Sequence, residues 1–233
     1  MKQGIRGFFL AAVLAALLAG TCAAQGAYHA AYLYGFPDGS IRPEQPLTRA
    51  ELAQSLCRLL PEQTETAQDA AEAFCDVESG FWAEAAIAKM ARLGLMRGAP
   101  DGRFLPEQGV TGGELAIILE RLRQSEEAGL CAAPLAAGWA QQEISFAAGN
   151  GWVMGLHGDA FAKEQALTRG EFAQIMNRIL GRTPEALSAL LVGMPLFSDN
   201  LDTTAPFFLA IQEAAVDHTA QCADEGERWI ALG

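Results

Sequence analysis

Two arginine side chains occupy positions at which they could bind an anion. Arg49 follows Thr48, and Arg169 follows Thr168, in two segments that predict the start of a helix. Free backbone N–H groups and the positive end of the helix dipole favour a negative charge at such a place. A guanidinium there can hold a carboxylate through two parallel hydrogen bonds. We therefore expect both arginines to contact an anionic ligand; the alternative is that they are solvated side chains beside structural caps.

Two tryptophans and two aspartates are further candidates for ligand contact. Trp82 and Trp139 could each offer a flat apolar face to a sugar ring, but an aromatic residue near a helix start is more often a core anchor, which we favour. Asp38 and Asp101 lie in Pro-Asp-Gly turns, where the carboxylate can close an Asx turn. For these aspartates a ligand role is secondary.

The sequence contains no catalytic or metal-binding pattern. No two carboxylates are marked by spacing as a glycosidase pair, and there is no G-x-S-x-G motif, P-loop or dinucleotide fingerprint. The histidines His29, His157 and His218 are far apart and lack metal-ligand spacing. We therefore expect no enzymatic activity, no metal and no other cofactor.

Three Thr-x-x-Glu boxes predict the helices that position these residues. In each box the Thr hydroxyl and the Glu carboxylate satisfy backbone donors of the first turn reciprocally. The pairs are Thr48 and Glu51, Thr111 and Glu114, and Thr168 and Glu171. Apolar residues at helical spacing follow every box, and we expect these faces to pack in a shared core.

The chain also repeats itself. The sequence Gly-x-Pro-Asp-Gly at residues 35–39 recurs at residues 98–102, a shift of 63 residues, and a third, more divergent unit follows 57 residues later. Each unit is predicted to be a helix, a turn-rich loop and a second helix. A last fragment containing Asp199 is similar to the first half of a unit, which contains Asp76, and we expect both aspartates to cap helices.

The N-terminus predicts an export signal. Lys2 and Arg6 precede an apolar run at residues 8–19, which is too short to span a bilayer, and small residues follow. We expect cleavage after Ala24, with a lipid anchor at Cys22 as the alternative, and no membrane span in the mature chain.

The charge balance excludes one class of partner. The chain has 16 Lys and Arg against 28 Asp and Glu, and its net charge is −12. Broad nucleic-acid binding needs clustered cations that displace phosphate counterions, so we expect no nucleic-acid partner.

The cysteines leave two alternatives open. The mature chain has Cys57, Cys75, Cys131 and Cys222, without a C-x-x-C motif. Two disulfides and buried free thiols are both compatible with this spacing.

Taken together, these motifs resemble the S-layer homology (SLH) domain. The pattern F-x-D-V, W-A, A-I, G-x-P-D-G and T-R-x-E runs through almost all of the mature chain. The resemblance implies a mostly α fold, in which three helix-loop-helix SLH repeats form a pseudo-threefold spindle around a central helical bundle. The expected parts are a signal peptide at 1–24, repeat 1 at 25–72 with only its loop and second helix, repeat 2 at 73–128, repeat 3 at 129–182, and a C-terminal half-repeat at 183–233.

The resemblance also implies a function. SLH repeats attach exported proteins to the cell wall by binding secondary cell-wall polysaccharide on peptidoglycan, often with pyruvate ketals. In the family the Arg of T-R-x-E contributes to the ligand groove, which points to Arg49 and Arg169 here. Gly112 stands at this position in repeat 2, so we expect one weakened groove. The alternative is an envelope or S-layer structural protein that acts through self-association or protein partners; both interpretations predict a secreted protein at the cell surface.

The order of the half-units suggests how repeat 1 is completed. Repeat 1 lacks a first helix, whereas residues 197–216 look like a first half without a second. We hypothesise that this C-terminal segment supplies the missing helix of repeat 1.

Overall fold

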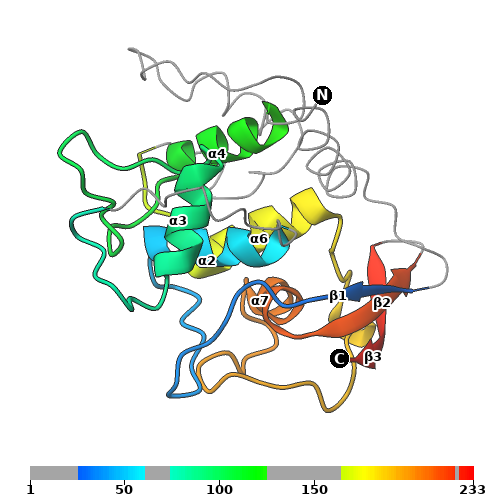
Figure 1. The fold of residues 1–233 in the computed structure, drawn as a ribbon. Coiled ribbons are helices and arrows are strands. Elements are labelled where there is room, and N and C mark those ends of the chain that lie inside the picture. Colours follow the sequence, from blue (N-terminus) through cyan, green and yellow to red (C-terminus); the bar gives the residue numbers. More distant parts are fainter. Residues whose placement is uncertain (1–25, 61–73, 125–163, 224–225) are drawn as a thin grey trace. The chain divides into compact units, whose positions relative to one another are not determined.

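The computed structural model describes residues 26–60, 74–124, 164–223 and 226–233, which form two compact units (Figure 1). Unit 1 contains the described residues between Pro46 and Leu167, and unit 2 contains those up to Gln45 and from Thr168 onwards. The expected signal peptide at 1–24 lies outside the described residues. None of the described helices is long and apolar enough to cross a membrane.

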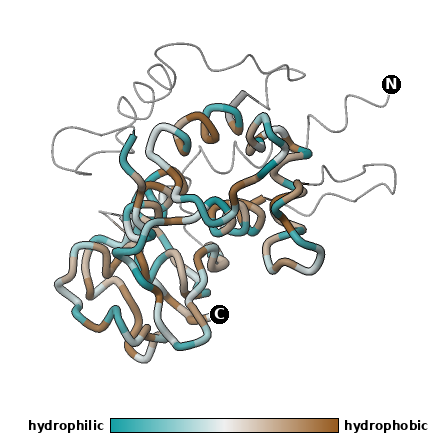
Figure 2. Tube along the Cα trace, turned by 90° about the vertical axis from the view of Figure 1, so that its left-hand side faces the viewer, coloured by the Kyte–Doolittle hydropathy of each residue, from teal (hydrophilic) through white to brown (hydrophobic). Residues whose placement is uncertain are grey.

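The described part of unit 1 contains three helices. They are α2 (Arg49–Leu59), α3 (Glu84–Arg92) and α4 (Gly112–Gln124). Helix α2 packs against α3, and their buried faces carry apolar residues at helical spacing, among them Leu52, Leu56 and Met90. The apolar stripes predicted from the sequence are therefore confirmed as buried faces. Figure 2 shows hydrophobic and hydrophilic residues alternating along the trace.

Three residues that precede the helix caps form a closed triangle of backbone hydrogen bonds. The N–H of Leu47 donates to the carbonyl of Leu167, that of Leu167 to Val110, and that of Val110 to Leu47, each at 2.8 Å. All three side chains are buried. Because every residue of the triangle donates one bond and accepts one, the three chain segments meet without leaving a buried backbone group unsatisfied.

Unit 2 combines helices with a sheet. Its elements are β1 (Ala27–His29), α6 (Arg169–Leu180), the 3-10 helix η1 (Leu187–Ala189), α7 (Phe208–Ala215), β2 (His218–Cys222) and β3 (Glu227–Leu232). The strands form an antiparallel sheet in the order β1-β2-β3, and α6 packs against α7. Along β3 the buried Glu227 and Trp229 alternate with the exposed Arg228 and Ile230, so one face of this strand points into the unit.

The expectation of a mostly α fold is wrong. Of the described residues, 36% are helical and 14% lie in strands or bridges, so the fold is mixed α/β. The sequence hid the sheet because two of its inward positions are taken by His218 and Glu227 rather than by apolar residues. The period-2 hydrophobic pattern that predicts a half-buried strand is therefore broken.

Burial of the Leu47 side chain predicts that its removal strongly destabilises the protein. Leu47→Ala removes a fully buried side chain, and we expect the free energy of unfolding to fall by about 2–5 kcal/mol. Leu201→Ala, at an exposed leucine, is the matched control and should change it by less than about 0.5 kcal/mol. Urea unfolding followed by circular dichroism measures both variants, and equal midpoints would contradict the prediction.

Candidate functional site

The candidate arginines begin helices whose first turns are closed by reciprocal caps. At α2 the Thr48 Oγ1 accepts the Glu51 N–H at 3.2 Å, and the Glu51 Oε2 accepts the Thr48 N–H at 2.9 Å. The same pair of bonds occurs between Thr111 and Glu114 at α4, and between Thr168 and Glu171 at α6. The Thr and Glu side chains of the three boxes thus satisfy backbone N–H groups at the helix starts, as the sequence predicted.

The guanidinium of Arg49 is held by a loop of unit 1. Its Nε donates to the carbonyl of Phe104 at 2.8 Å and its Nη2 to that of Arg97 at 2.7 Å, while the guanidinium carbon lies 4.6 Å from the centre of the Phe104 ring. Burial lowers the Arg49 pKa, an effect that the nearby carboxylates of Glu114 and Asp76 oppose. Only 11% of the side chain is exposed.

One nitrogen of the Arg49 guanidinium does not donate to a loop carbonyl. Its Nη1 lies 3.9 Å from Glu114 Oε1 and donates no hydrogen bond to a described residue. Since Nη1 carries two N–H groups, it can still bind an anion while Nε and Nη2 keep the guanidinium in place.

Arg169 repeats the same arrangement in unit 2. Its Nε donates to the carbonyl of Ile41 at 2.8 Å and its Nη2 to that of Tyr34 at 2.6 Å, and its guanidinium carbon lies 4.9 Å from the centre of the Phe36 ring. The residue is only 2% exposed. The alternative of solvated arginines is therefore wrong for both residues, because each guanidinium ties a loop to a helix start.

Two aspartates also bind these two loops. The carboxylate of Asp76 accepts the N–H groups of Phe104 and Leu105 at 2.7 and 2.8 Å. That of Asp199 accepts those of Ile41 and Arg42, both at 2.8 Å. The expectation that these aspartates cap helices is wrong, because their hydrogen-bond partners lie in loops.

The turn aspartates are paired within their own loops. Asp38 accepts the Ser40 hydroxyl at 2.6 Å and Arg42 Nη2 at 2.8 Å, and Asp101 accepts Arg103 Nε at 2.8 Å. The hydrogen bonds from Ser40 and Arg42 hold the pKa of Asp38 well below its usual range, and those from Arg103 lower the pKa of Asp101. Both carboxylates therefore act first as turn residues.

Trp82 is not part of the core. It is 57% exposed, with its ring centre 5.5 Å from that of Phe81, so the interpretation as a core anchor is wrong. Trp139 lies outside the described residues.

The described cysteines do not match either sequence-based alternative fully. Cys57 is a half-buried free thiol and Cys75 an exposed one, whereas Cys222 is disulfide-bonded. Exposure of Cys75 contradicts the expectation of buried thiols.

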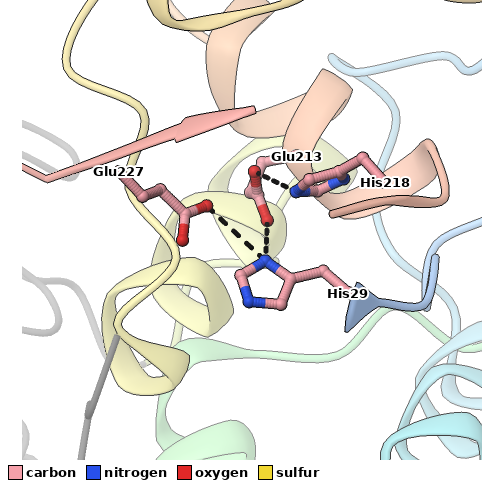
Figure 3. A group of neighbouring side chains, drawn as sticks. All are labelled: His29, Glu213, His218 and Glu227. Atoms are coloured by element: carbon pink, nitrogen blue, oxygen red, sulfur yellow. Dashed lines mark hydrogen bonds and ion pairs between the residues drawn. The ribbon is translucent and has the colours of Figure 1, made fainter. Parts of the chain in front are cut away.

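One group of side chains in unit 2 was not expected from the sequence. His29, Glu213, His218 and Glu227 come together so closely that one potential ligand atom from each lies within 4.8 Å of all the others (Figure 3). Burial, together with the neighbouring charge of Glu213, raises the pKa of Glu227 to about 9. No sequence signal could have found this group, because its members come from four separate elements without a regular spacing.

Comparison with known proteins relates the chain to a family and to three larger proteins. The S-layer homology domain model matches residues 23–53 and 74–116. The chain is 30% identical over 220 residues to "Cell surface glycoprotein 1" of Acetivibrio thermocellus, a match that covers 89% of this chain and 9% of that protein.

Two further relatives are similar to smaller parts of the chain. A "Cellulosome-anchoring protein" of Acetivibrio thermocellus is 29% identical over 67% of this chain and 37% of its own length. An "Amylopullulanase" of Thermoanaerobacterium thermosulfurigenes is 30% identical over 64% of this chain and 8% of its own length. The chain thus spans only a minor part of each of these relatives.

The role of Arg49 in holding its loop predicts a stability effect. Arg49→Ala removes two charged hydrogen bonds and leaves two loop carbonyls without their donor, so we expect the free energy of unfolding to fall by about 2–4 kcal/mol. Arg103→Ala breaks an exposed ion pair of the same loop and should cost less than about 1 kcal/mol. Urea denaturation of both variants is the measurement; an Arg49 variant as stable as the Arg103 variant would refute the structural role.

Proposed function

Since the chain belongs to the S-layer homology family, we propose that it attaches to the cell wall by binding a secondary cell-wall polysaccharide. It is a protein of the cell surface. Two relatives are named as a cell surface glycoprotein and a cellulosome-anchoring protein, and an anchoring role for this chain is consistent with those names. In this role the chain binds its ligand without chemical conversion.

The observation that carries the proposal is the fixed guanidinium of Arg49 with its remaining donors. Because Nε and Nη2 are bound to carbonyls, the side chain is already ordered before a ligand arrives, and binding costs little rotamer entropy. Nη1 is then the group that contacts an acidic substituent of the polymer. The carboxylate of a pyruvate ketal has the charge and size that this contact requires.

Two exposed residues of unit 1 support the same function. Trp82 presents an open aromatic face on which a sugar ring can stack. Arg97, whose carbonyl binds Arg49, is exposed and adds local positive charge. Such short-range charge is needed because the protein as a whole, at −12, repels an anionic polymer at distances up to a Debye length.

The two arginines contribute unequally under this proposal. Arg169 is almost fully buried, so its main role is to position the loop of residues 34–41. At the corresponding position of α4, Gly112 has no side-chain donor. Arg49 is therefore the arginine that makes the principal ligand contact.

One observation favours the alternative of an envelope protein that acts through protein contacts. The segment 187–201 exposes four large apolar residues, Leu187, Val192, Leu196 and Leu201. Exposed apolar side chains of this kind are typical of surfaces that bind another protein when they form one patch.

Co-sedimentation with purified peptidoglycan sacculi separates these functions. We expect residues 25–233 to bind sacculi that carry the polysaccharide and not sacculi from which it has been removed chemically. Trp82→Ala should weaken binding about fivefold, equivalent to about 1 kcal/mol, and Trp82→Tyr should restore part of it. Trp82 is exposed, so this substitution does not threaten the fold.

Two results would count against polysaccharide binding. Equal sedimentation with both preparations would point to another wall component. Failure to bind either, together with concentration-dependent self-association in analytical ultracentrifugation, would favour the envelope protein.

We further propose that the chain consists of three repeats with the expected boundaries and that its C-terminal half-repeat completes repeat 1. Matching contacts support this. The Ser198 N–H donates to the Gly39 carbonyl at 3.0 Å, as that of Cys75 does to Gly102 at 3.1 Å, and both acceptors occupy the same place in the Pro-Asp-Gly turn. The Asp199 and Asp76 carboxylates likewise bind equivalent loop residues, and α6 packs on α7 as α2 packs on α3.

This repeat arrangement predicts that Asp199 and Asp76 are equally important. Asp199→Ala and Asp76→Ala each leave two loop N–H groups without their acceptor, and each should lower the free energy of unfolding by about 2 kcal/mol or more. Asp202, whose carboxylate accepts hydrogen bonds from the nearby Thr204, is the matched control. If Asp199→Ala were as mild as Asp202→Ala in urea unfolding, the C-terminal segment would not complete repeat 1.

A further inference from the structure

Four polar side chains meet inside unit 2, where a folded protein normally places apolar ones. His29 ends β1, Glu213 lies on α7, His218 begins β2 and Glu227 begins β3, and Figure 3 shows the four side chains pointing toward one another. The side chains of Glu213 and His218 are 0% exposed, that of Glu227 is 2% exposed and that of His29 is 12% exposed. The group is thus enclosed, with access from the side of His29.

The distances between these side chains match the spacing of ligands around one metal ion. His29 Nδ1 lies 3.2 Å from Glu213 Oε1 and 3.6 Å from Glu227 Oε1, and His218 Nε2 lies 3.1 Å from Glu213 Oε2. A tetrahedral ion with ligands at about 2.0–2.1 Å separates neighbouring ligand atoms by about 3.3–3.4 Å. Small side-chain movements would therefore place four donors around one centre.

Hydrogen bonds from surrounding residues fix the orientation of these side chains. Residues that bond to metal ligands without touching the metal have the same effect in known metal sites. His218 Nδ1 lies 2.8 Å from the Val216 carbonyl, which can only accept, so Nδ1 carries a proton and Nε2 faces the carboxylate of Glu213. Trp229 Nε1 donates to Glu213 Oε2 at 2.8 Å, and its ring stacks on His218 with centres 3.9 Å apart. Such contacts fix the direction of ligand lone pairs.

The group also contains two buried carboxyl groups. Glu227 Oε1 is buried and makes no hydrogen bond, and within the described part of the chain neither Glu213 nor Glu227 is ion-paired with a lysine or arginine. Burying a carboxylate is costly unless it is paired or coordinates a metal. A divalent cation with two neutral imidazoles would neutralise both carboxylates.

We propose that His29, Glu213, His218 and Glu227 bind one divalent transition-metal ion, with Zn²⁺ as the best match. Imidazole nitrogens select first-row transition metals over Mg²⁺ and Ca²⁺, and two nitrogens with two carboxylate oxygens at tetrahedral spacing suit zinc. Because the protein supplies all four ligands, the site is structural. It does not depend on the proposed polysaccharide binding.

The ion would join the two ends of the described chain. His29 and Glu213 are separated by 184 residues, and the site connects the N-terminal strand with α7 and the β2–β3 hairpin. A metal that binds only the folded arrangement adds its binding free energy to folding. The ion would therefore hold β1 onto the C-terminal half of unit 2.

Zinc binding by the intact mature chain tests the site. The free thiols Cys57 and Cys75 are first replaced by serine, because thiolates also bind zinc. The chelator-treated protein is then mixed with ZnCl₂, passed over a desalting column and analysed by mass spectrometry for metal content. We expect one zinc ion per chain, a higher melting temperature, and a change in the fluorescence of Trp229, which stacks on a ligand.

Substitutions of two ligands and of one control residue make the test specific. Glu227→Gln and His29→Ala should each weaken zinc binding by more than about 100-fold, since even the loss of an outer partner costs about 10–100-fold. Glu44→Gln, at an exposed carboxylate of the same unit, should bind like the parent protein.

The outcome is decisive even if a ligand is important for folding. Glu227→Gln keeps the side-chain shape and replaces a potential carboxylate ligand by a neutral amide, so this variant should fold without metal, which circular dichroism verifies. Absence of retained zinc in the parent protein, or equal retention by the parent and both ligand variants, would overturn the proposal.

Discussion

The triangle of backbone hydrogen bonds between Leu47, Val110 and Leu167 is the constraint on which the described structure of unit 1 depends. Leu47 and Val110 directly precede the cap threonines of α2 and α4, so the bonds that join these segments also determine where the two helices can begin. The residues that follow these threonines, Arg49 and Gly112, are placed as a consequence. The triangle itself is buried, which explains why its side chains are apolar and why polar groups nearby need partners.

Arg49 and Arg169 are buried at packed helix starts, so they have a structural role as well as a candidate role in ligand binding. A guanidinium placed against a packed helix start must exchange water for protein acceptors, and the loop carbonyls supply them. Loop and helix start are thereby held together by the same charged group that is a candidate for ligand contact. Stability and recognition are coupled at Arg49, and only the donors that the loop leaves unused can serve a ligand.

The two ends of the chain are joined by polar contacts of long range. Asp199 holds the loop of residues 35–43, and β1 pairs with β2 beside the buried histidines and glutamates. Both contacts place N-terminal residues against the C-terminal segment within unit 2. This segment is therefore an integral part of unit 2.

Features whose partners lie close along the chain could be predicted from the sequence. The caps at Thr48, Thr111 and Thr168 and the Asx turn at Asp38 involve residues at most three positions apart, so residue type and spacing suffice to predict them. The pairing of β1 with β2, the loop contacts of Asp76 and Asp199, and the contact of His29 with Glu213 could not be predicted in this way. Asp76 meets Phe104 28 residues further on, and His29 meets Glu213 184 residues further on, and no local spacing marks which distant residue will be met.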